Sequence, residues 1–532
     1  MTPLLHNAPA PLQLDADVLV IGGGLAGTWA AVAAARKGAR VVLAEKGYCG
    51  TSGVTATAGP GHWWVPPEHR ASAIDKRVTS AAELGDARWM ARILDTTWHS
   101  PPQLDRLYHF PSDEQGHKQY RALRGPEYLR AMRQLALEHQ VTLLDQSPAL
   151  ELLQTETGDL AGARGWQRQA GREWQVKAAA VVLATGGCGF ASRLLGSHTN
   201  TGDGYLMGVE AGAELSGMEF SSYYCIAPAG STMTRSMVYT FGRYFDGAGR
   251  ELEIPQGPAF NDALARALLQ GPVYCRLDRI PADIRARLPQ VQPNLMLPFD
   301  RLGIDPYRDR FPVTLHGEGT IRGIGGLRVV DDDCQTTVPG LFTAGDAASR
   351  EAVTGAISGG GAVNSSWALS SGQWAGAGAA RHALARPGTR TVIRNVARYG
   401  ILPIGNPGHD HLDTVRAVQD ELHPYDKNLF RSGARLQRSL YVLDNHWDRL
   451  RNQRSVADPT ALLRWRETAA LLASARWCYG SALARQESRG IHQREDIPTQ
   501  SSRFDAHLRS GGLDRPWVRH DPVRAEVPAC SN

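Results

Sequence analysis

The chain carries three glycines and a carboxylate whose spacing suits the binding of a dinucleotide: Gly22, Gly24, Gly27 and Glu45. The first glycine allows a tight turn, the second lets a pyrophosphate approach the main chain, and the third lets a helix pack closely on a strand. The N–H groups that open such a helix carry partial positive charge and bind phosphate oxygens. A carboxylate that ends the next strand accepts hydrogen bonds from ribose hydroxyls. The pattern therefore predicts a dinucleotide site.

The elements needed to position these residues are visible around them. Residues 17–21 form a short apolar run typical of a buried strand, and residues 25–37 are rich in alanine and favour a helix. Residues 39–44 form a second buried strand that ends at Glu45. Together they predict a complete strand–turn–helix–strand unit, which is the context that makes a glycine motif specific.

Later segments supply further small residues, glycine turns and carboxylates that could line a nucleotide site. Residues 50–59 are mostly small or carry hydroxyls, residues 182–187 predict a strand that runs into a glycine turn, and residues 338–346 predict a strand that ends at a carboxylate. From Asp413 onward apolar residues recur at helical spacing, which predicts a helical bundle, and the residues after Pro498 are polar and irregular.

Composition excludes several other classes of protein. The chain has 532 residues, of which 42% are hydrophobic and 21% charged, as in globular proteins. Its net charge of +5 forms no basic stripe, so nucleic acid is not an expected partner. We expect no membrane span and no secretion signal. Seven cysteines without a CxxC pair argue against a zinc site or an iron–sulfur cluster held by this chain alone, and they fit a cytoplasmic protein.

A fourth motif near the C-terminus narrows the choice of cofactor. The string from Glu487 to Pro498 matches ESRG-x-H-x-R-x-D-x-P. With the three preceding motifs in the same order, the sequence resembles the flavoprotein family of succinate dehydrogenase, fumarate reductase and L-aspartate oxidase over residues 15–498. The flavoprotein subunit of adenylylsulfate reductase is a more distant likeness. The resemblance implies FAD as the cofactor and an oxidoreductase activity.

The resemblance also implies a three-part α/β fold. A Rossmann-like FAD-binding domain would comprise residues 12–216 and 320–388. An inserted α+β capping domain would comprise residues 217–319, and a helical C-terminal domain with a tail would comprise residues 389–532. The cap would close over the flavin ring and exclude water.

The family motifs imply a set of cofactor contacts. These residues are Gly22, Gly24, Leu25, Ala26, Gly27, Glu45, Lys46, Thr51, Ser52, Thr57, Ala58, Gly59, Ala149, Thr185, Gly186, Asp203, Gly345, Asp346, Asn364 and Ser365. Some family members attach FAD covalently to a histidine that follows a serine, whereas here Gly53 follows Ser52. We therefore predict non-covalent FAD.

The sequence departs from the family at the site that clamps C4-dicarboxylates. Ile321 stands where the string H-x-x-x-G-G has its histidine, and Asn261 stands where the family has its proton-transfer arginine. Ser358 replaces a second clamp arginine, and Tyr224 replaces the histidine of M-E-F-x-Q-x-H. A dianion cannot leave water without such partners. We therefore predict a substrate other than succinate or fumarate.

Replacement catalytic residues are harder to identify. We name Arg322, His316, Tyr224 and Arg489 as candidates, although each also suits a structural role. Trp63 and Trp64 are more typical of packing between domains than of stacking on a substrate. The triplet His409, Asp410 and His411 lacks a further ligand at metal-binding spacing, so we predict no metal site.

The sequence thus predicts hydride transfer at flavin N5 on a small polar metabolite. Because this chain offers no cluster ligands, electrons would pass to a separate ferredoxin-like iron–sulfur subunit. Two alternatives stay open: an oxidase that uses oxygen, and a non-catalytic FAD subunit that only transfers electrons. The oligomeric state is also open.

Overall fold

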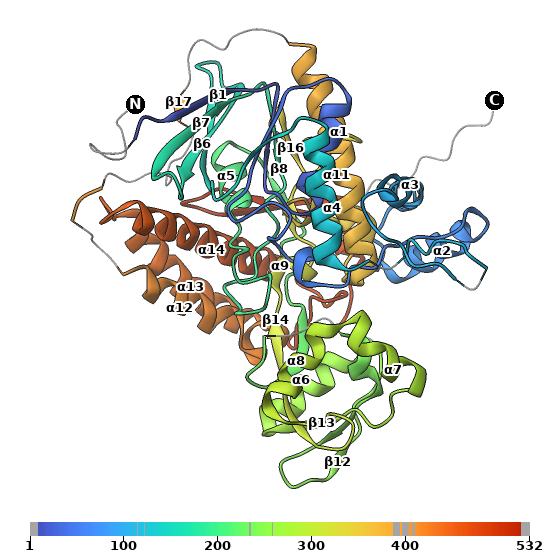
Figure 1. Cartoon of the computed structure of the whole chain (residues 1–532). Helices are drawn as coiled ribbons and strands as arrows, with labels where there is room; N and C mark the ends of the chain where they lie inside the picture. Colours follow the sequence, from blue (N-terminus) through green and yellow to red (C-terminus); the bar gives the residue numbers. More distant parts are fainter. Residues whose placement is uncertain are drawn as a thin grey trace, which may run out of the picture.

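The computed structural model describes residues 9–113, 115–121, 123–232, 236–257, 259–386, 394–395, 404–406 and 410–522. Figure 1 shows two sheets and their covering helices in the upper half, a bundle of long helices on the left, and a separate lobe at the bottom. The lobe is coloured green to yellow and comes from the middle of the chain.

A parallel sheet with strand order β16-β8-β2-β3-β4 carries the first motif. Its strands are β2 (Val18–Ile21), β3 (Val41–Ala44), β4 (Thr142–Leu144), β8 (Ala180–Leu183) and β16 (Leu341–Thr343). Every residue of β2 and β3 is buried, which explains their unbroken apolar runs. The strands and helix predicted around the glycines are confirmed to within two residues at each end.

Two long helices pack on each other beside this sheet, α1 (Leu25–Arg36) and α11 (Gly360–Leu384) (Figure 1). They approach closely because α11 presents glycines to α1: a Cβ at Gly372 would lie 2.4 Å from the carbonyl oxygen of Ala26, and one at Gly376 would lie 2.1 Å from that of Ala30. The alanine-rich composition of both helices therefore serves tight helix–helix contact.

A second sheet, with order β1-β7-β6-β5-β17, lies beside the first. Its strands are β1 (Leu12–Asp15), β5 (Ala149–Gln154), β6 (Leu160–Gln167), β7 (Arg172–Lys177) and β17 (Arg394–Asn395). The helices of this half are α2 (Arg70–Ser80), α3 (Ala87–His99), α4 (Gly125–Glu138) and α5 (Asp203–Glu210).

The lower lobe has its own five-stranded sheet and its own apolar core. The strands are β10 (Tyr224–Pro228), β11 (Arg243–Phe245), β12 (Glu251–Leu252), β13 (Val273–Arg276) and β14 (Phe311–Gly317). Its helices are α6 (Phe260–Gln270), α7 (Ala282–Val291) and α8 (Pro293–Leu302). All these elements fall within residues 217–319, the predicted cap, and β14 leads back to the upper half through α9 (Gly319–Arg322).

The C-terminal region is helical, as predicted, but its described part also contains two strands after Pro498. After α12 (His411–Leu422), α13 (Gly433–Arg451) and α14 (Pro459–Ala484), the chain forms a hairpin of β18 (Ala506–Gly511) and β19 (Trp517–Pro522). β18 pairs with β9 (Leu215–Ser216), which also pairs with β15 (Gly326–Leu327). The expectation of an irregular segment after Pro498 is wrong for residues 506–522, because β18 is stabilised by a partner almost 300 residues away. Residues 523–532 lie outside the described residues.

Short helical segments complete the fold. They are η1 (Thr55–Thr57), η2 (Pro67–His69), η3 (Pro101–Leu104), η4 (Met237–Phe241), η5 (Gly345–Ala347), α10 (Glu351–Thr354), η6 (Tyr425–Leu429) and η7 (Ser502–Phe504). Among the described residues, none of the helices is long and apolar enough to span a bilayer.

Candidate cofactor cavity and substrate side

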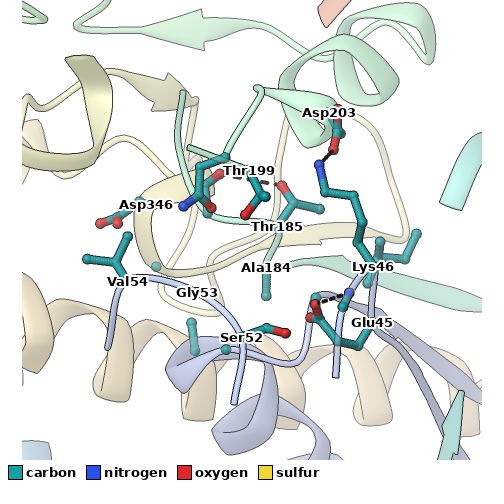
Figure 2. A pocket seen from close by; sticks show the side chains of 18 of the residues that line it. Glu45, Lys46, Ser52, Gly53, Val54, Ala184, Thr185, Thr199, Asp203 and Asp346 are labelled. Carbon is teal, nitrogen blue, oxygen red and sulfur yellow. Dashed lines mark hydrogen bonds and ion pairs between the residues drawn. The ribbon is translucent and has the colours of Figure 1, made fainter. Parts of the chain in front are cut away.

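A cavity of about 390 Å³ opens at the carboxyl ends of the parallel strands. This is where ligands bind in open α/β sheets. Fifteen of the predicted cofactor residues line it: Gly22, Gly24, Leu25, Ala26, Glu45, Lys46, Thr51, Ser52, Thr57, Ala149, Thr185, Gly186, Asp203, Gly345 and Asp346. Figure 2 shows Asp346 on one side of this space and Lys46 with Asp203 on the other.

The three motif glycines differ in what surrounds them, as their predicted roles require. Gly22 has φ +108°, and a Cβ there would lie 2.3 Å from the carbonyl oxygen of Ala184. A Cβ at Gly27 would lie 1.7 Å from the carbonyl oxygen of Gly22, so only glycine permits this packing of helix on strand. A Cβ at Gly24, at the start of α1, would meet nothing within 4 Å. The open space therefore lies where a pyrophosphate would approach the helix N-terminus.

Glu45 is fixed at the end of β3 by main-chain donors. Its Oε2 accepts a hydrogen bond from Gly23 N at 2.5 Å, and its Oε1 accepts one from Gly47 N at 2.6 Å. The side chain is buried and lines the cavity. A carboxylate has about four acceptor positions, so these two bonds leave capacity for ribose hydroxyls.

Lys46 joins three parts of the chain at one end of the cavity. Its Nζ lies 2.8 Å from Asp203 Oδ2 on α5 and 3.1 Å from Glu467 Oε1 on α14. Burial alone would lower the pKa of Lys46, but the two carboxylates outweigh it and raise that pKa, so the ammonium stays charged. Glu467 also lines the cavity, so the C-terminal helices contribute to its wall. No local motif points to Glu467.

Five predicted cofactor residues do not line the cavity. Gly27 packs on the strand, and the Ala58 carbonyl accepts a hydrogen bond from Gly125 N next to Gly59. Ser365 Oγ bonds Gly61 O and lies 3.2 Å from His62 Nδ1. Asn364 is buried in the first turns of α11 with no hydrogen-bond partner for either amide atom. An orphaned buried amide is what a bound ligand would satisfy.

Two comparisons with family models cover most of the chain. A model of an FAD binding domain matches residues 17–363, and a model of the fumarate reductase flavoprotein C-terminus matches residues 424–526. The chain belongs to the FAD-binding flavoprotein family of fumarate reductase, succinate dehydrogenase and L-aspartate oxidase. It is an FAD-dependent oxidoreductase of that family, which confirms the resemblance seen in the sequence and the predicted fold class.

Individual relatives of this flavoprotein are distant but match along nearly the whole chain. It is 26% identical to L-aspartate oxidase of Streptomyces coelicolor over 98% of this chain and 94% of the relative. It is 25% identical to one of the subunits of the fumarate reductase (CoM/CoB) of Methanothermobacter marburgensis, over 91% of this chain and 95% of the relative.

Two solved structures share its fold. The FrdA chain of E. coli quinol fumarate reductase, in a mutated form, has a TM-score of 0.83 at 21% identity and covers 98% of this chain and 99% of that one. Adenosine-5-phosphosulfate reductase in complex with sulfite has a TM-score of 0.77 at 18% identity, covering 97% of both chains. The predicted structural likeness to that reductase is thereby confirmed at the level of fold.

The positions predicted to replace the dicarboxylate clamp hold neutral groups that are buried or hydrogen-bonded to the main chain. Ile321 is 1% exposed. Asn261 Nδ2 donates to Tyr224 O at 2.9 Å, and Ser358 Oγ accepts from Gly360 N at 3.3 Å. Asn261 and Ser358 are thus engaged with main-chain groups, and none of the three residues offers a charge to a dianion.

Arg322 is the candidate whose surroundings best suit chemistry. Its Nη2 lies 3.4 Å from Tyr223 Oη, with the guanidinium 5.1 Å from the centre of that ring, and its Nε is buried without a partner. Burial alone would lower the pKa of Arg322, but Cys225, Tyr223 and Glu318 outweigh it and raise that pKa. A charged arginine beside a phenol can bind an anionic oxygen and orient a proton donor. Sequence reasoning missed Tyr223.

Two other candidates, His316 and Tyr224, have surroundings that differ from those of Arg322. His316 Nε2 donates to Ser231 O at 3.1 Å and lines a separate cleft of about 520 Å³ between the cap, residues 191–193 and the start of η6. Burial lowers the pKa of His316. The buried Tyr224 hydroxyl donates to His423 O at 3.0 Å. Like Arg322, neither residue lines the cofactor cavity, and a catalytic role for them stays a prediction.

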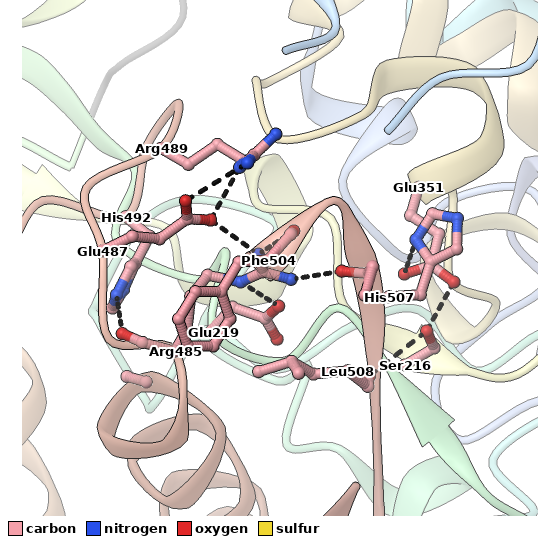
Figure 3. A network of polar contacts seen from close by, with 12 residues as sticks. Ser216, Glu219, Glu351, Arg485, Glu487, Arg489, His492, Phe504, His507 and Leu508 are labelled. Carbon is pink, nitrogen blue, oxygen red and sulfur yellow. Dashed lines mark hydrogen bonds and ion pairs between the residues drawn. The ribbon is translucent and has the colours of Figure 1, made fainter. Parts of the chain in front are cut away.

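Arg489 lies in a buried network of ion pairs (Figure 3). Its guanidinium lies 2.6 Å from both Glu487 Oε1 and Asp505 Oδ1, and 2.9 Å from Glu83 Oε2. With three carboxylates around it and no exposed atoms in its side chain, Arg489 joins the loop after α2 to the C-terminal segment. This geometry favours the structural alternative for Arg489.

The remaining sequence candidates have packing roles or lie outside the described residues. Trp64 stacks on Trp98 with ring centres 3.9 Å apart, and the Trp63 main chain bonds Ser366 Oγ. His409 lies outside the described residues. Within the described part of the chain, no group of three or more His, Cys, Asp or Glu side chains could hold a metal ion.

Proposed function

We propose that this flavoprotein binds FAD non-covalently and oxidises or reduces a small polar metabolite other than succinate or fumarate. FAD, when bound, supplies hydride transfer at ring atom N5. The residues that would hold it are those that line the cavity, with Gly24 and the start of α1 at the pyrophosphate and Glu45 at the ribose. Gly53, which follows Ser52 in the cavity wall, has no side chain to form a covalent link.

The observation that carries the substrate proposal is the contrast between the retained cavity and the neutral clamp positions. Asn261, Ile321 and Ser358 offer no positive charge, whereas Arg322 keeps its own. Arg322 would therefore bind one anionic or polar oxygen of the substrate, and Tyr223 would orient a proton at that oxygen. The cap would exclude water from this space.

Electron transfer to a separate iron–sulfur subunit completes the proposal. Relatives from Mycobacterium tuberculosis and Rickettsia conorii are named as flavoprotein subunits of fumarate reductase and succinate dehydrogenase. A second candidate, an oxidase that reduces oxygen, is supported by the likeness to L-aspartate oxidase along 98% of the chain. The six cysteines of the described residues are buried free thiols, as suits the reducing cytoplasm that we include in this proposal.

An anaerobic flavin assay tests these points. We expect acid precipitation to release yellow FAD from the protein pellet and a screen of metabolites to bleach or restore the flavin absorbance. Fumarate should not reoxidise the reduced flavin at an enzymatic rate, and such reoxidation would contradict the substrate proposal. Rapid reoxidation by air would favour the oxidase, whereas a co-purifying iron–sulfur polypeptide would favour the partner. A flavin that no metabolite bleaches would favour the non-catalytic alternative.

A further inference from the structure

Arg350 connects the cofactor cavity to the helix that carries Arg322. It is completely buried. Its Nη1 lies 2.7 Å from Asp346 Oδ1, and Asp346 lines the cavity. Its Nη2 donates to the carbonyl oxygens of Thr320 at 3.0 Å and Ile321 at 2.7 Å, and also to that of Gly323. One guanidinium therefore contacts both sides of the site.

These carbonyls lie in the single turn of α9 and directly after it. Carbonyl oxygens at a helix C-terminus lack partners within the helix, and a cation there is favourable. The main-chain N–H of Arg350 also donates to Ile324 O at 3.2 Å. Arg322 is the last residue of α9. The orientation of its side chain therefore depends on a turn that the hydrogen bonds of Arg350 stabilise.

The next residue, Glu351, anchors the main chain beside Arg350 to the C-terminal hairpin. Glu351 accepts hydrogen bonds from Ser216 and Arg509, and its Oε2 lies 3.1 Å from His507 Nδ1 (Figure 3). Burial alone would raise the pKa of Glu351, but Arg509 and His507 outweigh it and lower that pKa, so the carboxylate stays ionised. The C-terminal hairpin thereby fixes the main chain from which Arg350 extends.

We infer that Arg350 is a positioning residue that couples the cofactor carboxylate Asp346 to the substrate-side helix α9. The inference deepens the proposed function and rests on its assignment of Asp346 to the FAD cavity. Arginine suits this role because its planar fork serves the carboxylate with one nitrogen and the carbonyls with the other. A lysine can supply the charge to Asp346, but it cannot serve both groups with the same geometry.

The first test measures FAD affinity by titrating apoprotein and following quenching of flavin fluorescence. We expect Arg350→Met to weaken FAD binding about tenfold or more, because a buried charged partner of Asp346 is lost. Arg350→Lys should recover most of that affinity. The matched control is Arg476→Met, since Arg476 is also buried and bonds one carboxylate and two carbonyls, those of Asp444, Leu513 and Asp514, away from the cavity.

The second test measures the order of α9 without using activity. Limited trypsin digestion, mapped by mass spectrometry, should cleave the bond between Arg322 and Gly323 faster in both Arg350→Met and Arg350→Lys. The Arg476→Met variant should lose comparable thermal stability without faster cleavage at this bond. Equal cleavage in all variants would overturn the link to α9.

A double variant separates the inference from the proposed function. If Arg350 acts through Asp346, the affinity loss in Arg350→Met with Asp346→Asn should be smaller than the product of the two single losses. Fully multiplicative losses, or unchanged affinity in Arg350→Met, would overturn the coupling. If the wild-type protein itself fails to bind FAD, the proposed function fails, whereas the trypsin result still decides whether Arg350 orders α9.

Discussion

The cofactor cavity and the proposed substrate side of this flavoprotein are built from different kinds of chemical group. At the cavity, glycine turns, a helix N-terminus and main-chain donors to Glu45 form most of the frame. On the proposed substrate side, side chains would carry the chemistry, and Ile321, Asn261 and Ser358 stand at positions where the family resemblance predicts cations. A main-chain site depends on backbone geometry, so single substitutions alter it mainly at its glycines. A side-chain site can be rebuilt by single substitutions without loss of the fold.

The largest expected effect lies on the cavity side, at Gly27. Gly27→Val would force side-chain atoms into the carbonyl of Gly22, so we expect a loss of about 3 kcal/mol or more in the free energy of unfolding. Urea denaturation of the apoprotein measures it. A variant as stable as the wild type would show that α1 does not rest on β2 as described.

His62, which lies outside the cavity lining, should make stability depend on pH. Its buried imidazole contacts Ser365 at the start of α11, and burial lowers the pKa of His62 to about 4 from 6.5. The unfolded chain therefore binds this proton more readily. We expect about 3 kcal/mol of stability to be present above pH 6.5 and lost as the pH falls toward 4.

Chemical denaturation across this pH range measures the effect, with His62→Gln as the variant that should flatten the curve. His109→Gln, which replaces an exposed histidine, is the control and should follow the wild type. An unchanged curve for His62→Gln would mean that its imidazole is not kept neutral by the fold.

On the substrate side, Arg322→Gln should reduce turnover of the substrate found in the bleaching screen by about a hundredfold, since it removes a preorganised charge. FAD content should stay unchanged, because Arg322 does not line the cofactor cavity. Arg328→Gln is the control, as Arg328 pairs with Glu214 beside β9 and with Asp521 of the C-terminal hairpin. Loss of FAD from the Arg322→Gln variant would contradict the proposal that the cofactor cavity and the substrate side depend on separate residues.

The smallest expected effect concerns Gly24 in the cofactor cavity. Gly24→Ala adds a methyl group that meets no protein atom within 4 Å, so the free energy of unfolding should hardly change. The methyl group would instead occupy the space for the pyrophosphate, and we expect FAD affinity to fall about tenfold. Stability and affinity should thus separate at Gly24, whereas both should fall at Gly27. Unchanged FAD affinity would place the pyrophosphate elsewhere.

Sequence patterns predicted the parts of the fold whose contacts join residues close together along the chain. The strand, turn and helix around Gly22 to Gly27 follow from apolar runs and glycine spacing, and most of the implied cofactor residues meet in one cavity. The spacing of those residues could not place Glu467, which reaches the cavity from α14, nor the pairing of β18 with β9. Both depend on contacts between distant segments.

The proposed substrate side was harder to predict from the sequence, because its chemistry depends on single side chains. Tyr223 and Tyr224 look alike in sequence, but adjacent residues next to a strand point to opposite sides, so one contacts Arg322 and the other His423. Arg350 sits in no motif, and its carbonyl acceptors lie 27 to 30 positions earlier. For Arg489, the nearby Glu487 was the available sign of an ion pair.

The contact of Lys46 with Glu467 has a consequence for biosynthesis. During translation the glycine motif leaves the ribosome early, but one wall of its cavity belongs to the last quarter of the polypeptide, as does the hairpin behind Glu351. At roughly 5–20 residues per second, the nascent chain would wait many seconds before that wall exists. We therefore expect stable loading of the flavin to be a late event, and products truncated before Glu467 should remain colourless.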